Sequence, residues 1–173
     1  MSRLFRIVGL LLLGTWLGAA VFFSAAVAPS LFSVLRGADL PNANALAGSI
    51  VTRLLGSVNR GGFEISIFLL VFGYFMGRGQ TKLSRAIEMI SLAIMAIMTG
   101  VGHWVIAARM TALRAAMQLP IDQIALNDPR RITFDSLHRY SVAAMAVAII
   151  AALIAFVSIA IRNVSAPSAG AGG

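Results

Sequence analysis

Cysteine is absent from this chain, and charged residues are few. Without a thiol the protein forms no disulfide, no thiolate metal site and no cysteine nucleophile. Charged residues make up 12% of the sequence, about half of the ~25% that is usual in soluble domains. So few charges cannot cover a water-facing surface, and the composition therefore predicts an integral membrane protein.

What the chain has instead is apolar residues and an excess of positive charge. Hydrophobic residues account for 59% of its 173 positions, and 14 Lys and Arg against 6 Asp and Glu give a net charge of +8. The basic residues flank or cap apolar runs, which favours contact with anionic lipid headgroups. There is no phosphate-binding loop and no basic stretch interleaved with exposed aromatics, so nucleic acid is not an expected partner.

Four apolar runs predict four membrane-spanning helices, since ~20 apolar residues cross the hydrocarbon and a helix satisfies its own backbone. They cover about residues 4–27, 45–77, 83–118 and 129–162. The first run resembles a secretion signal, but it is longer than the ~7–15 residues of a signal core. Pro29 would also follow the candidate cleavage point after Ala28, so we interpret the run as a membrane helix.

Breaking and capping residues set the expected helix ends. Pro29, Gly37 and Pro41 predict that the chain leaves the membrane after the first helix. The third helix is expected to continue as an amphipathic extension until Pro120. Asp128 is expected to cap the fourth helix, with Pro129 in the first turn, where proline is tolerated.

The second run is expected to form one long helix with two different halves. Residues 63–77 are strongly apolar, whereas residues 45–62 are amphipathic and are expected to lie at or beyond the membrane surface, with a bend at Gly61-Gly62. In the amphipathic half, apolar residues recur at helical spacing at Leu46, Ile50, Leu54 and Val58.

The predicted fold is all-α: a four-transmembrane-helix bundle of up-down-up-down topology, with helices 2 and 3 extended beyond the bilayer on one side. Small residues four apart favour close helix packing in lipid. They are Gly14 and Gly18, Gly73 and Gly77, Ala96 and Gly100, and Ala144, Ala148 and Ala152. Residues 1–162 are expected to form the transmembrane domain, and residues 163–173 a disordered tail.

Polar side chains concentrate where the first and third helices end and the second and fourth begin. Ionisable groups in membrane helices usually face the bundle interior and have partners. The predicted polar cluster or ligand site contains Arg60, Glu64, His103, Asp135, His138, Arg139 and Ser141. Arg60 and Glu64 are four residues apart and are expected to pair, as is Asp135 with Arg131 or Arg139.

The residues in this region also have purely structural interpretations, and Arg60 with Glu64 is most simply a charge-neutralising pair. His103 suits an interhelical hydrogen bond, and Asp135 with His138 suits a hydrogen-bonded pair at a helix entrance. Trp104 suits an interfacial anchor, and Trp16 suits packing. Met89, Met95 and Met98 with His103 raise the alternative of copper binding, although methionine more often fills gaps in apolar packing.

Two histidines on separate helices also raise the alternative of axial haem ligation, but no cofactor or metal site is predicted. Catalysis is not predicted either, because there is no HExxH sequence, no pair of mid-membrane aspartates and no serine nucleophile beside a base. The sequence thus favours a non-enzymatic binding protein, scaffold or accessory subunit, with membrane lipids and another subunit or a second copy as partners. A small-solute or metal-ion transporter is the alternative.

Two stretches resemble a known family. "GTWLGAAVFFSAAVAPSLFSVL" places a Trp-x-Gly in the first helix before an Ala-Pro exit, and "FDSLHRYS" places Leu-His at the start of the last helix with Ser three residues beyond the histidine. Both resemble the transmembrane-protein-205-like family of small four-helix membrane proteins. The residues that carry the resemblance are Trp16, Gly18, Phe22, Ala28, Pro29, Phe32, Leu137, His138 and Ser141.

The resemblance implies a four-span fold and no particular reaction. It also leads us to expect an amide about six residues after the histidine, where this chain has Ala144. The expected location is a bacterial inner membrane. Positive charges flank the first helix more closely before it, at Arg3 and Arg6, than after it, which favours cytoplasmic termini, although counting bases over the whole chain weakly favours the reverse.

Overall fold

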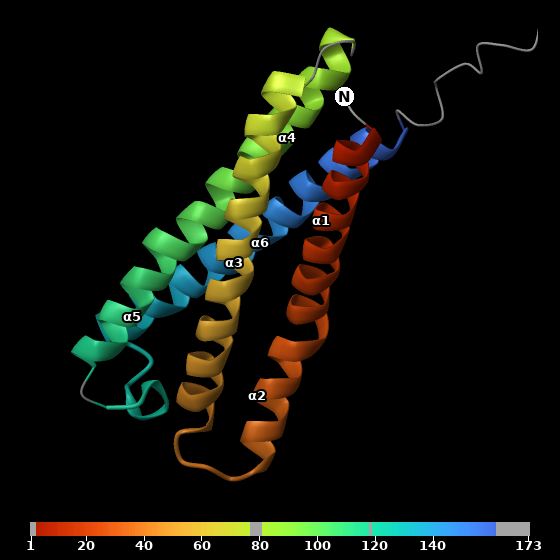
Figure 1. The fold of residues 1–173 in the computed structure, drawn as a ribbon. Helices are drawn as coiled ribbons and strands as arrows, with labels where there is room; N and C mark the ends of the chain where they lie inside the picture. The colour runs from red at the N-terminus through yellow and green to blue at the C-terminus, as the bar shows by residue number, and fades with distance from the viewer. Residues whose placement is uncertain (1–2, 77–80, 118, 162–173) are drawn as a thin grey trace, which may run out of the picture.

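The structure is a computed structural model that describes residues 3–76, 81–117 and 119–161. All regular secondary structure in these ranges is helical. Four of the described segments are long and apolar enough to span a membrane: Leu4–Gly37, Ala43–Phe75, Lys82–Ala116 and Pro129–Ile161. They alternate in direction along the bundle (Figure 1), which confirms the predicted four-helix membrane bundle. The protein is therefore an integral membrane protein.

The helices are named in chain order with their π-helical and 3₁₀ interruptions. They are α1 (Arg3–Phe22), the π-helix η1 (Phe23–Val27), α2 (Ala28–Gly37), α3 (Ala43–Met76), α4 (Lys82–Gly100), the π-helix η2 (Val101–Ile106), α5 (Ala107–Ala116), the 3₁₀ helix η3 (Ile121–Gln123) and α6 (Pro129–Ile161). At ~1.5 Å per residue, each span of 33 to 35 residues is about 50 Å long, against ~30 Å of hydrocarbon. All four spans, including the first, therefore have length to spare beyond the hydrocarbon.

The first membrane helix does not end before Pro29, and that prediction was wrong. Proline in an α-helix lacks the N–H that would bond one turn back, and its ring meets the carbonyl there. Here the wider π-helical turn η1 comes immediately before it, and Pro29 lies in the first turn of α2, where a missing N–H costs little. The helix then continues to Gly37, and Asp39 in the α2–α3 turn has a positive φ of 50°.

α3 is one uninterrupted helix of 34 residues that passes through Gly61-Gly62. Its inward face in the first half is formed by Ala43, Ala47 and Val51, which are buried, whereas Leu46 and Leu54 are exposed. In lipid, large apolar residues can face outward at no cost, while small ones let helices approach. Leu46 and Leu54 of the predicted apolar stripe therefore face outward, whereas Val58, at the end of the stripe, packs against the main core.

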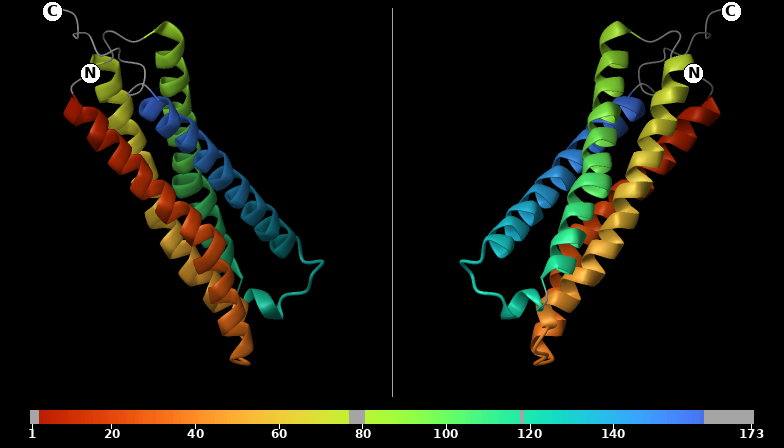
Figure 2. Two further views of the ribbon diagram at one scale, coloured as in Figure 1. Left: turned by 90° about the vertical axis from the view of Figure 1, so that its right-hand side faces the viewer. Right: turned by 90° about the vertical axis from the view of Figure 1, so that its left-hand side faces the viewer.

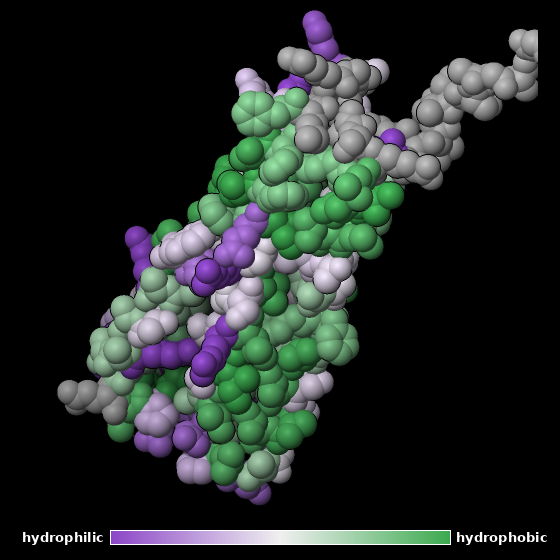
Figure 3. Space-filling view, viewed as in Figure 1, coloured by the Kyte–Doolittle hydropathy of each residue, from purple (hydrophilic) through white to green (hydrophobic). Residues whose placement is uncertain are grey.

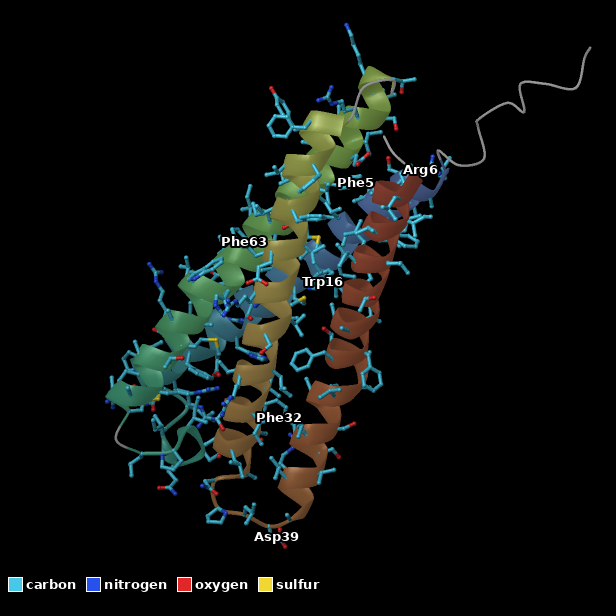
Figure 4. The ribbon with its side chains drawn as sticks, viewed as in Figure 1. Phe5, Arg6, Trp16, Phe32, Asp39 and Phe63 are labelled. Carbon is cyan, nitrogen blue, oxygen red and sulfur yellow. The ribbon has the colours of Figure 1, made fainter. Side chains whose placement is uncertain are left out.

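The main core lies between α1, α3, α4 and α6. Leu13, Leu92 and Met95 are fully buried there, together with Ala148 and Ala152 of the predicted small-residue row on α6. Trp16 is buried and lies between α1 and α3 (Figure 4), as the packing interpretation predicted.

Glycines at helix contacts differ in how closely a neighbour approaches. A methyl group on Gly14 would lie 3.4 Å from the Phe156 ring, but one on Gly18 would meet nothing within 4 Å. The predicted Gly14–Gly18 row is thus a contact at one position only. Gly77 and the predicted tail 163–173 lie outside the described residues.

The bundle opens at the end opposite the N-terminus. α6 packs against α4 and α1, but its first half diverges from α2, as both views in Figure 2 show. A second apolar cluster holds that half of α6 to α5 and η3 through Ile106, Met110, Ile124 and Phe134. In the space-filling view, hydrophilic side chains gather on the α3 and α5 side of this end, below a mainly hydrophobic surface (Figure 3).

Candidate functional site

A cleft of about 860 Å³ lies at the open end of the bundle. Its walls are η1, α2 and α3 on one side and α5 and α6 on the other. Small-molecule sites usually occupy ~300–1,000 Å³ and combine mostly apolar walls with a few polar groups. This cleft fits both criteria, and it is partly open to the outside.

The floor of the cleft is the loop that contains η3. The Asp122 carboxylate accepts hydrogen bonds from the Asn44 side chain at 2.7 Å and from the backbone N–H of Ala45 at 3.1 Å. Ala45 belongs to the first turn of α3, whose N–H groups have no partner in the helix and attract negative charge. Arg131 of α6 donates to the carbonyls of Ile121 and Ile124. The floor is thereby fixed to both walls.

The start of α6 is set by Asp128, as the sequence predicted. Its carboxylate accepts the backbone N–H of Arg130 at 2.8 Å and pairs with the Arg130 guanidinium at 2.9 Å. These hydrogen bonds with Arg130 lower the pKa of Asp128 to about 2. The cap fixes the point from which the α6 wall rises.

The α6 wall changes from polar to apolar along its length. Asp135, His138 and Ser141 are spaced three residues apart, share one face and line the cleft. Beyond Ser141 the lining continues with Val142, Met145, Ala146 and Ile149. The polar lining on this helix thus ends at Ser141.

Two buried polar side chains in the cleft wall have no partner. Asn59 of α3 is 4% exposed and Ser141 of α6 is 7% exposed. Neither side chain makes a hydrogen bond to any part of the chain that the structure describes. Their polar atoms are not among the fully buried unpaired atoms of the described residues, so they keep access to the cleft that both residues line.

Arg114 crosses from α5 towards α3 inside the cleft. Its guanidinium carbon lies 5.0 Å from the centre of the Phe134 ring, and one of its terminal nitrogens would be 2.9 Å from a methyl group on Gly48. Gly48 therefore leaves the space that Arg114 occupies. Within the described ranges this guanidinium has no hydrogen-bond acceptor and no carboxylate partner.

A second, polar cavity of about 480 Å³ adjoins the cleft at the α2–α3 turn. It shares Arg36, Asn44, Asp122 and Arg131 with the larger cleft. Among the described residues Arg36 bonds only through its Nε, which donates to the Phe32 carbonyl one turn back. The outer part of the cleft is thus the polar part.

The seven residues of the predicted polar cluster do not form a single group. Asp135, His138 and Ser141 line the cleft. Arg60 and Glu64 pair at 2.8 Å as predicted, but both are exposed on the outside of α3. Arg139 is also exposed, and it donates to the Ser136 hydroxyl.

His103 lies outside the cleft, against α3. Its ring is next to Gly56 and contacts Trp104 edge to face at 4.8 Å, and its Nδ1 is buried without a hydrogen-bond partner in the described part of the chain. The structure thus separates the two histidines: His103 faces α3, and His138 faces the cleft. The described residues include no group of three His, Asp or Glu side chains close enough to hold a metal ion.

The expected pairing of Asp135 was wrong. Within the described residues its carboxylate forms no ion pair, because Arg131 is directed to the loop carbonyls and Arg139 to Ser136. Asp135 is instead exposed towards the cleft.

Sequence reasoning missed the lining residues on α2, α3 and α5, chiefly Arg36, Asn59 and Arg114. A signal for Asn59 existed, because Asn44, Gly48, Val51, Leu55 and Asn59 recur at helical spacing. The signal was easily overlooked, since this stripe contains two amides and a glycine and is less apolar than the outward stripe beside it. Arg114 had no local signal, because its role depends on the distant Gly48 and Phe134.

Comparison with known proteins places most of the chain in one family. Residues 11–118 match a family described as Domain of unknown function (DUF4149). The chain belongs to this family. No curated protein and no solved structure matches it. The match covers the cleft walls on α2, α3 and α5, whereas the α6 wall lies beyond the matched residues.

Proposed function

We propose that this DUF4149 protein is a non-enzymatic membrane binding protein whose ligand is an organic molecule held in the cleft. One observation carries the proposal: Asn59 and Ser141 are buried in the cleft wall without a hydrogen-bond partner in the described residues. Their polar atoms keep access to the cleft, so a ligand there can supply the hydrogen-bond partners that the described chain does not.

We also propose a narrower family group and a membrane location for this protein. The Trp-x-Gly and Leu-His stretches support membership of the transmembrane-protein-205-like group. Trp16 in the core and His138 at the cleft fit such a shared design. We place the protein in a bacterial inner membrane with cytoplasmic termini. The basic residues before the first helix support that orientation.

The experiment is to purify the protein from its own membranes in mild detergent, extract it with organic solvent and identify co-purified molecules by mass spectrometry. A molecule present at near one per chain is expected. The test variant is Ala146→Phe, which extends a ring into the cleft from a residue that lines it and is exposed. We expect this variant to lose the molecule.

The matched control is Ala143→Phe. Ala143 is also exposed and lies nearly one turn away on α6, but it does not line the cleft. The control is expected to retain the molecule. Equal amounts in both variants, or none in the unmodified protein, would count against a cleft ligand.

A further inference from the structure

We infer that the cleft binds a membrane lipid with an anionic phosphate headgroup, an inference that rests on the proposed binding function. The headgroup would lie between Arg36 and Arg114, and the acyl chains would leave past Met145 and Ile149. Three independent features of the cleft support this: its uncommitted charges, its change of polarity and its side opening.

The uncommitted charges in the cleft are mainly positive. Arg131 and Asp122 are both engaged in fixing the floor. Of the remaining charged lining residues, Arg114 has no acceptor in the described ranges, and Arg36 has both terminal nitrogens available after its Nε bond to Phe32. Asp135 opposes them with one carboxylate, and His138 adds a titratable ring.

An arginine without a partner beside an aromatic ring is well suited to a phosphate. The guanidinium presents a planar fork of donors that matches phosphate oxygens, and it stacks on aromatic faces. Arg114 already lies over Phe134, and Gly48 keeps its path clear. Arg36 approaches the same cleft from the opposite wall.

The change of polarity along α6 matches an amphiphile. Asp135 and His138 line the outer part, and Val142, Met145 and Ile149 line the inner part. Ser141 marks the boundary on α6, and Asn59 is the last residue of α3 that lines the cleft. A hydroxyl and an amide at this level suit the ester carbonyls and glycerol oxygens that join a headgroup to its chains.

The side opening gives the chains a place to go. The first half of α6 diverges from α2 (Figure 2). Val142 and Ala146 line the inner part of the cleft and are also exposed, so the apolar inner wall is continuous with the outer surface of the bundle. A lipid can therefore enter from the bilayer while its headgroup stays at the polar end. A soluble phosphate would use the headgroup site and leave the apolar inner wall uncovered.

The test is native mass spectrometry of the full-length protein in detergent, titrated with phosphatidylglycerol, phosphatidylcholine or phosphatidylethanolamine of identical acyl chains, or with inorganic phosphate. We expect phosphatidylglycerol to bind most tightly and inorganic phosphate to leave its occupancy unchanged. Arg114→Gln should weaken phosphatidylglycerol binding about tenfold, the usual worth of one charge-assisted hydrogen bond. Arg114→Lys keeps the positive charge and should retain part of the affinity for phosphatidylglycerol.

Two further variants make the result specific. Arg109→Gln removes the same charge from an exposed position on α5 that does not line the cleft, and it should change nothing. Asp135→Asn removes the opposing carboxylate and should strengthen phosphatidylglycerol binding. The expected change in phosphatidylglycerol affinity is opposite to that of Arg114→Gln, and a variant that fails to fold would not bind the lipid more tightly.

The outcomes separate this inference from the proposed function. Four results would overturn the inference of an anionic lipid while leaving the proposal of a cleft ligand intact. Two concern the lipids: equal binding of all three, or a preference for phosphatidylethanolamine that is lost in Asp135→Asn. The other two are displacement of the lipid by inorganic phosphate and equal losses of binding in Arg114→Gln and Arg109→Gln. Lipid occupancy that is the same in the unmodified protein and in Ala146→Phe would overturn lipid binding in the cleft. A co-purified molecule that Ala146→Phe loses would still support the proposed function.

Discussion

The indole Nε1 of Trp16 donates a 2.9 Å hydrogen bond to the carbonyl oxygen of Val58, which joins the middle of α1 to the middle of α3. The ring approaches so closely because Gly62, one turn beyond Val58, has no side chain. A methyl group there would lie 2.7 Å from two ring atoms of Trp16 and 2.9 Å from the Thr99 side chain. A buried indole usually finds an acceptor, and here it finds one in a helix backbone.

Gly62→Ala is therefore expected to destabilise the protein by about 1–3 kcal/mol, the usual cost of overpacking a core. The methyl group would clash with the rigid indole ring of Trp16. The measurement is reversible unfolding of the detergent-solubilised protein, followed by circular dichroism.

The neighbouring glycine gives the matched control. A methyl group on Gly61 would meet nothing within 4 Å, and alanine favours a helix by about 1 kcal/mol over glycine, so Gly61→Ala should be neutral or stabilising. Similar losses for the two variants would show that flexibility of the pair matters more than the Trp16 contact.

Asn59→Leu is expected to leave the free energy of unfolding unchanged or to raise it by up to about 1 kcal/mol. The substitution removes an amide that has no hydrogen-bond partner in the described residues, and it keeps a similar side-chain volume. The same variant should lose ligand from the cleft. A loss of stability above about 1 kcal/mol would mean that the amide supports the fold itself.

Ala148→Leu should destabilise the bundle by about 1–3 kcal/mol, because Ala148 is fully buried where α6 packs in the main core. Ala143→Leu adds the same atoms on an exposed face of α6 and should be close to neutral. Thermal unfolding in detergent measures both. Equal melting temperatures would argue that small residues on α6 are not a packing requirement.

Acid should weaken the cap of α6 through Asp128. The pKa of this carboxyl is lowered from 3.8 to about 2 by its hydrogen bonds with Arg130. A lowered pKa in the folded state adds stability at pH values above about 4, and this contribution is lost as the pH falls towards 2. Asp128→Ala should lose stability at neutral pH and should lack this acid-dependent loss, as thermal unfolding at pH 7, 4 and 2.5 would reveal. A parallel pH profile in the two proteins would contradict the assignment.

The helices could be predicted from the sequence because membrane spans are long apolar runs, and the cap at Asp128 could be predicted because capping is local. The course of the first helix past Pro29 could not, since it depends on the π-helical turn that precedes the proline. The face that α3 turns inward was also hidden. Lipid accepts Leu46 and Leu54 on the outside as readily as a core would.

The cleft was the least predictable part. His138 and Ser141 were identified as candidates because polar residues at the start of an apolar helix are unusual. Their separation from His103, Arg60 and Glu64 depends on helix rotation, which spacing alone does not determine. The divergence of α6 from α2, which makes room for a ligand, is a property of the packed bundle and has no local sequence pattern.

The π-helical turns give the bundle a way to set two orientations in one span. Each residue added to a helix turns everything beyond it by about 100°. Because η2 joins α4 to α5, the number of residues in it fixes the direction in which Arg114 and Met110 point relative to Leu92 and Met95. Shortening Val101–Ile106 by a single residue would swing Arg114 about a quarter of a turn around the axis while the α4 contacts stayed in place, so the chain's length there is as specific as its composition.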